Sequence, residues 1–350
     1  MKVWQIAAGM SGQDYRDLFY DHDVMIMGGN RYGSALETDY SGGKGASIDN
    51  LVNSFAHGPQ PGDRVLMRHS RQIVGIGEIP TGDQNQYSYE DAFQTVYGWD
   101  LRHARRVKWA PRGKLGPLAK ISLTAARQPT FTRVLQSKLI EAALAAPSRW
   151  FDRPLKRKPS FDTSIYNEEE LGEKLFSAGI SNKNIQDIYA ALRQAANLES
   201  WYRKEGSGER PSEHEVISHI TLPLFLGLGW SHQQMAVEWK NIDIALFKRT
   251  PTNEDNCVMV LEAKGLYEPL GNVLEQPIHY IKRHGLAKVK YILVTNGLIL
   301  LVYARSGKRW SSDTPPIAFL DVSCLQKQYA IPKGTNPVRT LVMLQPSSLR

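Results

Sequence analysis

Residues 241–265, NIDIALFKRTPTNEDNCVMVLEAKG, decide how the second half of this 350-residue chain is interpreted. Two apolar runs of strand length are joined by a polar segment that is typical of a hairpin loop. Asp243 lies inside the first run, and Glu262 and Lys264 end the second. A strand that only packs in a core has no reason to contain two carboxylates and a lysine. We therefore expect these three side chains to have a chemical role.

The spacing of these residues predicts that their side chains converge. Side chains alternate between the two faces of a strand, so Glu262 and Lys264 project from the same face. Asp243 can reach the same place if the two runs pair as antiparallel strands. Carboxylates are ligands for hard divalent cations, and a lysine beside such an ion can orient a water molecule or offset charge on a phosphate. The pattern therefore favours metal-dependent phosphodiester cleavage.

The surrounding sequence predicts an α/β unit with a mixed central sheet. Ser212 can cap its first helix, which offers Glu213 as a third carboxylate and Glu215, two residues later, as the alternative. A hairpin turn is predicted at the TNG of 295–297. In chain order the unit has a helix over 213–227, strands over 235–248 and 257–264, a helix over 271–284, and strands over 289–295 and 298–304.

The first 112 residues predict a different unit, rich in short strands and glycines. A hairpin is predicted over 61–79, and Ser47 is a plausible N-cap of a helix over 47–55. Short strands with interleaved glycines favour a small β-barrel over a layered α/β unit. Further strand-like runs lie at 3–9, 23–29 and 105–110.

The segment 113–204 predicts a basic, helical linker, with helices over 132–146 and within 167–203. Positive charge is concentrated around its start: fifteen Lys and Arg residues lie between 102 and 158, against two acidic residues. The whole chain has a formal net charge of +8. A solvated basic face is one interpretation, and contact with nucleic-acid phosphates is the one we favour.

Two cysteines, Cys257 and Cys324, cannot form a disulfide framework or a cysteine-based zinc site. No apolar run is long enough to cross a bilayer, and no secretory leader precedes the first strand. These features predict a cytoplasmic protein without a membrane partner.

The residues of the second half resemble the PD-(D/E)XK nucleases, in particular the nuclease domain of type I restriction R subunits. The motifs are SEHEVISHITLPLFLGLGW, VEWKNIDIALF, VMVLEAKG, QPIHY and YILVTNGLILLVY, within a domain over 205–350. The resemblance implies Glu213, Asp243 and Glu262 as metal ligands for Mg²⁺ or Mn²⁺. It also implies catalytic roles for Lys264 and Gln276, the latter with Tyr280 one helical turn later. Ile242 stands where the family name has proline.

The first half resembles the EVE/PUA-like domains, relatives of YTH domains, over residues 1–112. The motifs are GDRVLM, QIVGIGEI and RRVKWA. The resemblance implies a barrel that accepts a flipped, modified base, whose extrusion must be repaid by stacking and hydrogen bonds. Arg102, Arg105 and Arg106 are expected to contact the flanking phosphates. The residues expected in the base pocket are Trp4, Ser11, Asn30, Tyr32, Trp99 and Asp100.

Together these patterns predict a modification-dependent restriction endonuclease that binds double-stranded DNA carrying a modified base, expected to be a modified cytosine. Because one site cuts one strand, we expect a homodimer formed through the helices of 116–200. The alternatives are a nuclease of DNA repair or RNA processing, and a nucleic-acid-binding module with an inactive nuclease core.

Overall fold

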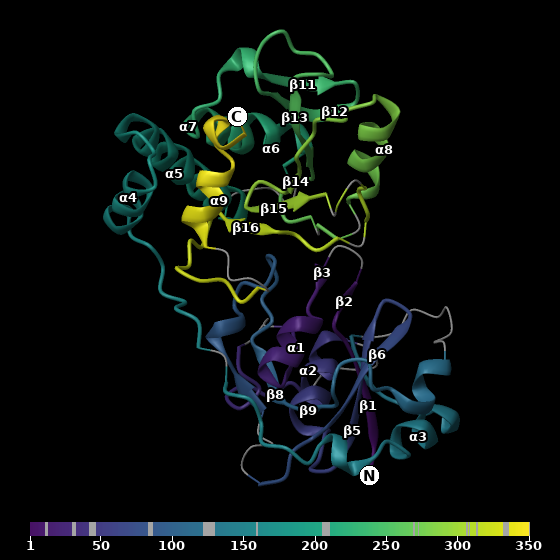
Figure 1. Cartoon of the computed structure of the whole chain (residues 1–350). Helices are drawn as coiled ribbons and strands as arrows, with labels where there is room; N and C mark the ends of the chain where they lie inside the picture. Colours follow the sequence, from purple (N-terminus) through teal and green to yellow (C-terminus); the bar gives the residue numbers. More distant parts are fainter. Residues whose placement is uncertain are drawn as a thin grey trace. The chain divides into compact units, whose positions relative to one another are not determined.

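The computed structural model describes residues 1–350 except 11–12, 30–32, 42–46, 83–86, 122–129, 159, 205–210, 269, 272, 306, 308, 313, 332–335 and 350. The chain divides into two compact units (Figure 1): unit 1 is Met1–Phe161 with Ala330–Pro332, and unit 2 is Asp162–Tyr329 with Lys333–Arg350. Both units contain helices and sheets, so the protein is a mixed α/β protein. The predicted linker over 113–204 is shared between the two units.

The described strands of unit 1 form a five-stranded sheet, a three-stranded sheet and a two-stranded hairpin. The five-stranded sheet has the order β10-β1-β5-β6-β9, in which only β1 and β5 are parallel. The three-stranded sheet has the order β4-β8-β7, and β2 pairs with β3. The strands are β1 Val3–Ala7, β2 Gly9–Met10, β3 Gln13–Asp14, β4 Val24–Met27, β5 Arg64–His69, β6 Gln72–Glu78, β7 Tyr87–Tyr89, β8 His103–Arg106, β9 Lys108–Trp109 and β10 Phe131–Arg133.

The sequence predicts a small β-barrel here, whereas the described strands form open sheets and do not close into a barrel. One reason is that β9, the last strand of the larger sheet, is only two residues long and offers little edge for further pairing. β8 and β9 are separated by Val107 alone but belong to different sheets, so the backbone links the two. The predicted hairpin is confirmed by the antiparallel pairing of β5 with β6.

The helices of unit 1 are α1 Arg16–His22, α2 Ile48–His57 and α3 Ser137–Leu144. The predicted cap of α2 is confirmed, because the Ser47 side chain accepts a hydrogen bond from the N–H of Asn50. The predicted helix over 132–146 is shorter than expected. Its first residues belong to β10, which pairs with β1 and so is extended. Pro147 follows the helix, as predicted.

The described strands of unit 2 form one six-stranded sheet with the order β11-β12-β13-β14-β15-β16. β13 and β14 are parallel, and the other neighbours are antiparallel. Every residue of β13 is buried, as expected for an interior strand of a covered sheet. The strands are β11 Met235–Trp239, β12 Ile242–Phe247, β13 Cys257–Ala263, β14 Tyr291–Thr295, β15 Ile299–Ala304 and β16 Ala318–Asp321.

Two turns of this sheet illustrate what the sequence could predict. The predicted strand over 235–248 is in fact the hairpin of β11 and β12. The chain reverses at Lys240 and Asn241, whose φ angles of 55° and 63° suit a two-residue hairpin turn. Neither residue is a glycine, so this turn has a weak sequence signal. The predicted turn at 295–297 is confirmed, with Gly297 at φ 89° between β14 and β15.

Unit 2 contains the helices α4 Glu168–Ser177, α5 Asn182–Lys204, α6 Glu213–Val216, α7 Leu222–Gly227, α8 Glu275–Arg283 and α9 Pro337–Met343. The π-helical turn η5, Ile217–Thr221, joins α6 to α7, so the predicted helix over 213–227 is one continuous helical run. Such turns are frequent at functional sites. None of the helices in the described parts of the chain has the length and apolar character needed to span a bilayer.

Candidate functional site

The two apolar runs of the opening stretch are adjacent strands of the unit 2 sheet. β12 and β13 pair antiparallel, with Ile244 opposite Leu261, which confirms the predicted pairing. Continuing that register by one residue places Asp243 opposite Glu262, so that both side chains lie on one face of the sheet. A carboxylate oxygen of Asp243 also accepts a hydrogen bond of 2.6 Å from the N–H of Ala263. This bond fixes the orientation of the Asp243 carboxylate.

Lys264 lies between two carboxylates at the end of β13. Its ammonium nitrogen is 2.7 Å from Oε1 of Glu262 and 3.2 Å from Oε1 of Glu213. Its backbone N–H donates to the carbonyl of Thr295 at 2.8 Å, which continues the pairing with β14 beyond the end of the strand. We call Glu213, Asp243, Glu262 and Lys264 the candidate cluster. Its members come from α6, β12 and β13.

The candidate cluster holds more negative charge than Lys264 offsets. Burial raises the pKa of Glu262 to about 7; the hydrogen bond from Lys264 opposes this shift, and the charges of Asp243 and Glu213 add to it. Burial also raises the pKa of Asp243, against the hydrogen bond from Ala263. Burial alone would lower the pKa of Lys264, but its bond to Glu262 and the nearby carboxylates raise it. The carboxylates are therefore close enough to destabilise one another's ionised forms.

The start of α6 selects which of two nearby acids faces Lys264. The N–H of Glu215 donates to Oγ of Ser212 at 3.3 Å, and the N–H of Ser212 donates to the Glu215 carboxylate at 2.8 Å. This capping box occupies Glu215, which also accepts a hydrogen bond of 3.4 Å from Oη of Tyr202. Glu213 is left to pair with Lys264.

The candidate cluster suits a hard divalent cation in the chemistry of its donors. Within the described residues, however, no three His, Cys, Asp or Glu side chains are arranged to hold one metal ion together. The ammonium of Lys264 stands between Glu213 and Glu262 and supplies the positive charge there. The oxygens of Glu213, Glu262 and Asp243 therefore fit Mg²⁺ or Mn²⁺ in type, and binding would require Lys264 to leave its bridging position.

Two further side chains flank the cluster and were not predicted to belong to it. Nδ1 of His214 is 3.4 Å from Oε1 of Glu238, and the nearby His214 favours the ionised form of Asp243. Glu238, with φ 54°, lies across from Asp243 when the register of β11 and β12 is continued. His214 could have been noticed because it follows Glu213. Glu238 could not, because the hairpin that brings it there has a weak sequence signal.

Gln276 and Tyr280 lie one turn apart on α8, with Nε2 of Gln276 3.5 Å from Oη of Tyr280. Gln276 is exposed. Among the described residues, the hydrogen bonds of this pair do not reach the candidate cluster. The catalytic role that the sequence predicts for Gln276 stays a prediction.

A cavity of about 450 Å³ lies in unit 1, within the range of small-molecule sites. Trp99 and Asp100, both predicted to contact a base, line it together with Tyr15, Met27 and Leu101. Trp99 is 41% exposed, so part of its side chain is accessible at the cavity. Three other predicted contacts lie outside the described residues: Ser11, Asn30 and Tyr32.

The sixth predicted contact, Trp4, belongs to the core of unit 1 instead of the cavity. It is 6% exposed, and its ring stacks on Phe131 with centroids 5.3 Å apart. Its indole N–H donates to a carboxylate oxygen of Asp63 at 3.0 Å. The reason is its position on β1, an interior strand of the five-stranded sheet. Tryptophan fits a packed sheet as well as it fits a base pocket.

Of the three arginines predicted to contact phosphates, only Arg102 is partly exposed. Its guanidinium donates two hydrogen bonds, of 2.9 and 2.6 Å, to the carboxylate of Asp100, and it lies 4.7 Å above the ring centroid of Tyr89. Hydrogen bonding to Asp100 raises the pKa of Arg102. Arg102 therefore contacts Asp100, a lining residue of the cavity, without lining the cavity itself.

The prediction for Arg105 and Arg106 is corrected, because they are 4% and 7% exposed and cannot meet a phosphate backbone as they lie. The Arg105 guanidinium donates to three backbone carbonyls, at 3.1 Å to Phe55, 2.7 Å to Ala56 and 3.1 Å to Pro59. Arg106 donates to a backbone carbonyl in the segment after η4 (Ser148–Trp150). Arg105 therefore joins the end of α2 to β8, and Arg106 joins the segment after η4 to β8, both within unit 1.

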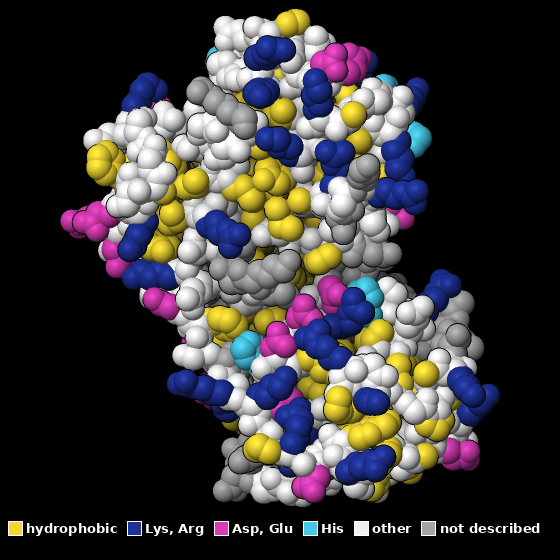
Figure 2. All heavy atoms as spheres, viewed as in Figure 1, with side chains coloured by type: hydrophobic (Ala, Val, Ile, Leu, Met, Phe, Trp, Pro, Cys, Tyr) yellow, Lys and Arg dark blue, Asp and Glu magenta, His cyan; other side chains and the backbone are white. Residues whose placement is uncertain are grey.

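Several of the basic residues between 102 and 158 pair with acidic side chains. Arg153 pairs with the buried carboxylate of Asp23 at 2.6 Å, and Arg112 pairs with Asp17 and Asp21. On the face shown in Figure 2, Lys and Arg side chains are scattered over the surface with acidic side chains among them. Among the described residues, four of the fifteen basic residues thus have acidic partners in unit 1: Arg102, Arg112, Arg153 and Lys158.

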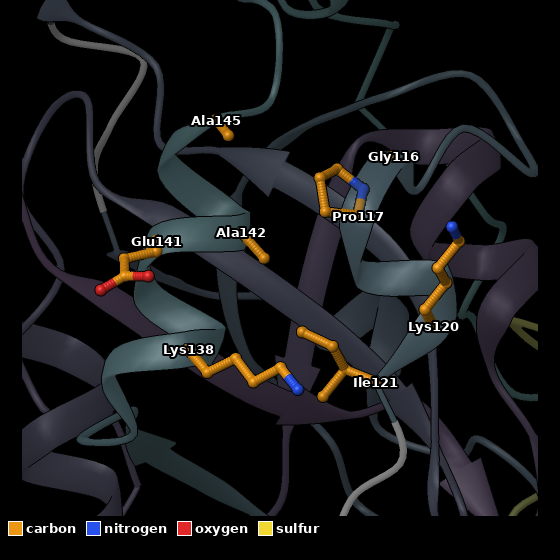
Figure 3. Close-up of a pocket in the computed structure, with 8 residues that line it drawn as sticks. All are labelled: Gly116, Pro117, Lys120, Ile121, Lys138, Glu141, Ala142 and Ala145. Carbon is orange, nitrogen blue, oxygen red and sulfur yellow. The ribbon is translucent and has the colours of Figure 1, made fainter.

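A second hollow of unit 1, about 740 Å³, lies between α3 and η3 (Gly116–Lys120). In Figure 3, Lys138 of α3 points across it toward Ile121, whereas Glu141 and Lys120 point away. The remaining lining consists of Gly, Pro and Ala residues. Because no polar groups converge on it, this hollow has no chemistry of its own.

No protein-family model matches the sequence, and no curated protein matches it at a significant level.

Proposed function

We propose that unit 2 is a divalent-metal-dependent nuclease core of the PD-(D/E)XK type and that unit 1 recognises a modified base. The chain would then be a modification-dependent restriction endonuclease acting on double-stranded DNA. The observation that supports this most is the contact of Lys264 with both Glu262 and Glu213, beside Asp243 on the neighbouring strand. A lysine beside three carboxylates can serve metal-dependent phosphodiester hydrolysis, with the carboxylates as metal ligands and the lysine near the phosphate.

In this proposal Glu213, Asp243 and Glu262 would hold Mg²⁺ or Mn²⁺. The ion, when bound, would lower the pKa of water and stabilise negative charge on the phosphate. Lys264, released from its bridging position, would donate a hydrogen bond to a phosphate oxygen or to the attacking water. The N–H of Ala263 would keep the Asp243 carboxylate oriented through this change. The net reaction adds one water across a P–O bond of the backbone.

For unit 1 we propose that the cavity lined by Trp99 and Asp100 accepts the modified base, expected to be a modified cytosine. The Trp99 ring would stack on the base, and the Asp100 carboxylate, oriented by Arg102, would accept a hydrogen bond from an exocyclic amine. The EVE/PUA-like resemblance supports the same assignment. Because one candidate cluster cuts one strand, a double-strand break would require a homodimer or two bound copies.

The test is to incubate the purified chain with plasmid DNA, unmodified or carrying modified cytosine, in Mg²⁺ and in EDTA. We expect cleavage of the modified plasmid alone, and only in Mg²⁺. Equal cleavage of both plasmids would contradict recognition of the modification. Cleavage of neither, or cleavage that persists in EDTA, would contradict the metal-dependent nuclease.

A second candidate function is a nucleic-acid-binding protein whose α/β unit does not cut. It is favoured by one observation, that the carboxylates of the described residues are not gathered around a common metal position. Binding of DNA or RNA without cleavage of duplex DNA, single strands or RNA in Mg²⁺ or Mn²⁺ would support it. Cleavage of single-stranded DNA or RNA in preference to duplex DNA would instead favour a nuclease of repair or RNA processing.

A further inference from the structure

A tight turn begins at Gly265, directly after Lys264, and contains Tyr267. The N–H of Glu268 donates to the carbonyl of Gly265 at 2.9 Å, so Tyr267 is the third residue of this turn. Its φ angle is 66°. Glycine or asparagine is preferred at such a position, and a bulky side chain there is strained. Strained residues of this kind gather at ligand-binding sites.

The turn is held from two sides. The N–H of Leu266 donates to the carbonyl of Pro211, at the start of α6, at 3.4 Å. On the other side, Nδ2 of Asn296 donates to the carbonyl of Glu268 at 3.0 Å. A Cβ atom on Gly265 would lie 3.2 Å from the Pro211 carbonyl and 2.9 Å from the Glu268 carboxylate, so a larger residue would require small shifts in both neighbours. The position of Tyr267 is therefore fixed relative to the first turn of α6.

The Tyr267 side chain bridges this turn to α5 and remains 38% exposed. Its hydroxyl lies 3.3 Å from the carbonyl oxygen of Glu199 and 3.4 Å from Oε1 of the same residue. Arg203, one turn further along α5, pairs with the Glu199 carboxylate and has a side chain that is 70% exposed. An accessible aromatic ring thus lies beside an accessible guanidinium.

The same end of α5 contributes a second accessible ring. Trp201 is 50% exposed and packs edge-on against Tyr202, with ring centroids 4.9 Å apart. Tyr202 in turn donates to the carboxylate of Glu215, the residue that caps the helix bearing Glu213. We call Trp201, Tyr202 and Tyr267 the aromatic ledge. Tyr267 lies in the turn after Lys264, Tyr202 donates to Glu215 of α6, and Trp201 contacts Tyr202.

We propose that Tyr267 stacks on an unpaired nucleotide of the DNA strand whose phosphate lies at the candidate cluster. The proposal rests on the nuclease function proposed above. Bases alternate with phosphates along a strand, so a strand bound at Lys264 brings its neighbouring bases to the adjoining surface. Every base has a π-face, and Arg203 can meet the next phosphate. The contact requires a base that has left the duplex stack at the cleavage position, because bases within a duplex are already stacked.

The test measures the affinity of the full chain for a short fluorescein-labelled single-stranded DNA oligonucleotide by anisotropy in EDTA, so that no cleavage is required. We expect Tyr267→Ala and Tyr267→Gly to weaken binding about tenfold, and Tyr267→Phe, which keeps the ring, by less than about twofold. Phe176→Ala is the matched control, because Phe176 is an aromatic on α4 that is 61% exposed and lies apart from the ledge. It should leave affinity unchanged.

Thermal unfolding of the same variants separates binding from structure. Tyr267→Gly should not lower the melting temperature, because glycine relieves the positive φ. Wild-type affinity in both Tyr267→Ala and Tyr267→Gly would overturn the inference. If these variants bind more weakly but the wild-type chain does not cut DNA in Mg²⁺, the stacking role of Tyr267 is supported and the nuclease function is contradicted. If the wild-type chain cuts DNA but the Tyr267 variants bind as tightly as wild type, the nuclease function is supported and the stacking role is contradicted.

Discussion

Glu262 in unit 2 and Arg105 in unit 1 are both charged side chains buried at interior strands, but their charges are compensated differently. The Arg105 guanidinium has three backbone carbonyls as acceptors. Among the described residues, the Glu262 carboxylate has one hydrogen-bonding partner, Lys264, which it shares with Glu213. The pKa of Glu262 is accordingly raised to about 7, first by burial. Burial likewise lowers the pKa of Arg105 to about 10, so the two side chains differ in their partners: backbone acceptors are typical of a structural charge, and shared charged partners are typical of a site.

The largest expected effect concerns the carboxylates of the candidate cluster. Asp243→Asn should reduce cleavage about a thousandfold, because an amide is a poorer ligand than a carboxylate and metal catalysis contributes several kcal/mol. DNA binding should stay within about twofold of wild type, since the amide keeps an acceptor for the N–H of Ala263. Initial rates on modified plasmid and anisotropy in EDTA measure the two effects. Asp255→Asn, an exposed carboxylate of the same unit, is the control; equal losses in both variants would contradict the assignment.

Arg105 should behave in the opposite way. Arg105→Met leaves three carbonyls without their donor and is expected to lower the free energy of unfolding by about 3 kcal/mol. Urea unfolding followed by circular dichroism measures this loss. Because the ion pair of Arg102 with Asp100 is partly exposed, we expect Arg102→Met to lower the free energy of unfolding by less than about 1 kcal/mol. A stable Arg105→Met protein with weakened DNA binding would restore the phosphate-binding role that the sequence predicts.

Acid is expected to destabilise unit 1 through His103. Burial lowers the pKa of His103 in unit 1 to about 4 from its usual 6.5. The unfolded chain therefore binds a proton more readily, so the contribution of His103 is complete above pH 6.5 and is lost as the pH falls toward 4. We expect unit 1 to lose about 2 kcal/mol between pH 6.5 and 5. Hydrogen exchange in β4 and β8 measures this, and His103→Asn should flatten the dependence; an unchanged slope would contradict it.

The smallest expected effect separates two tryptophans of unit 1. Trp99→Ala should weaken binding of DNA with a modified base about tenfold and leave the melting temperature nearly unchanged, because Trp99 is 41% exposed at the cavity. Trp4→Phe should lower the melting temperature and leave affinity unchanged, because it removes the hydrogen bond to Asp63 from the core. Affinity measured against matched unmodified DNA tests both expectations. Loss of affinity in the Trp4 variant alone would contradict both assignments and would place Trp4, instead of Trp99, in contact with the base.

The sequence predicted unit 2 more closely than unit 1, for reasons that lie in particular residues. An aspartate within IDIALF and a glutamate within CVMVLEA stand out because a buried carboxylate without a partner is costly. The sequence around Trp4, Arg105 and Arg106 contains no comparable signal. A tryptophan packs readily in a sheet, and an arginine can be satisfied by carbonyls, so residue type alone could not separate pocket from core. The open sheets of unit 1 were missed for a related reason, because strand lengths such as that of β9 depend on pairing partners.

By itself the sequence determined most of the helices and strands between 213 and 304, the caps at Ser47 and Ser212, and the residue types of the candidate cluster. These features depend on local spacing, on side chains that reach neighbouring N–H groups, and on alternation along a strand. Only the tertiary structure decided that Lys264 bridges Glu213 and Glu262, that Tyr267 lies beside α5, and that Arg105 is internal. Such outcomes depend on which distant backbone groups share a position in space, and that is fixed by the packing of whole elements.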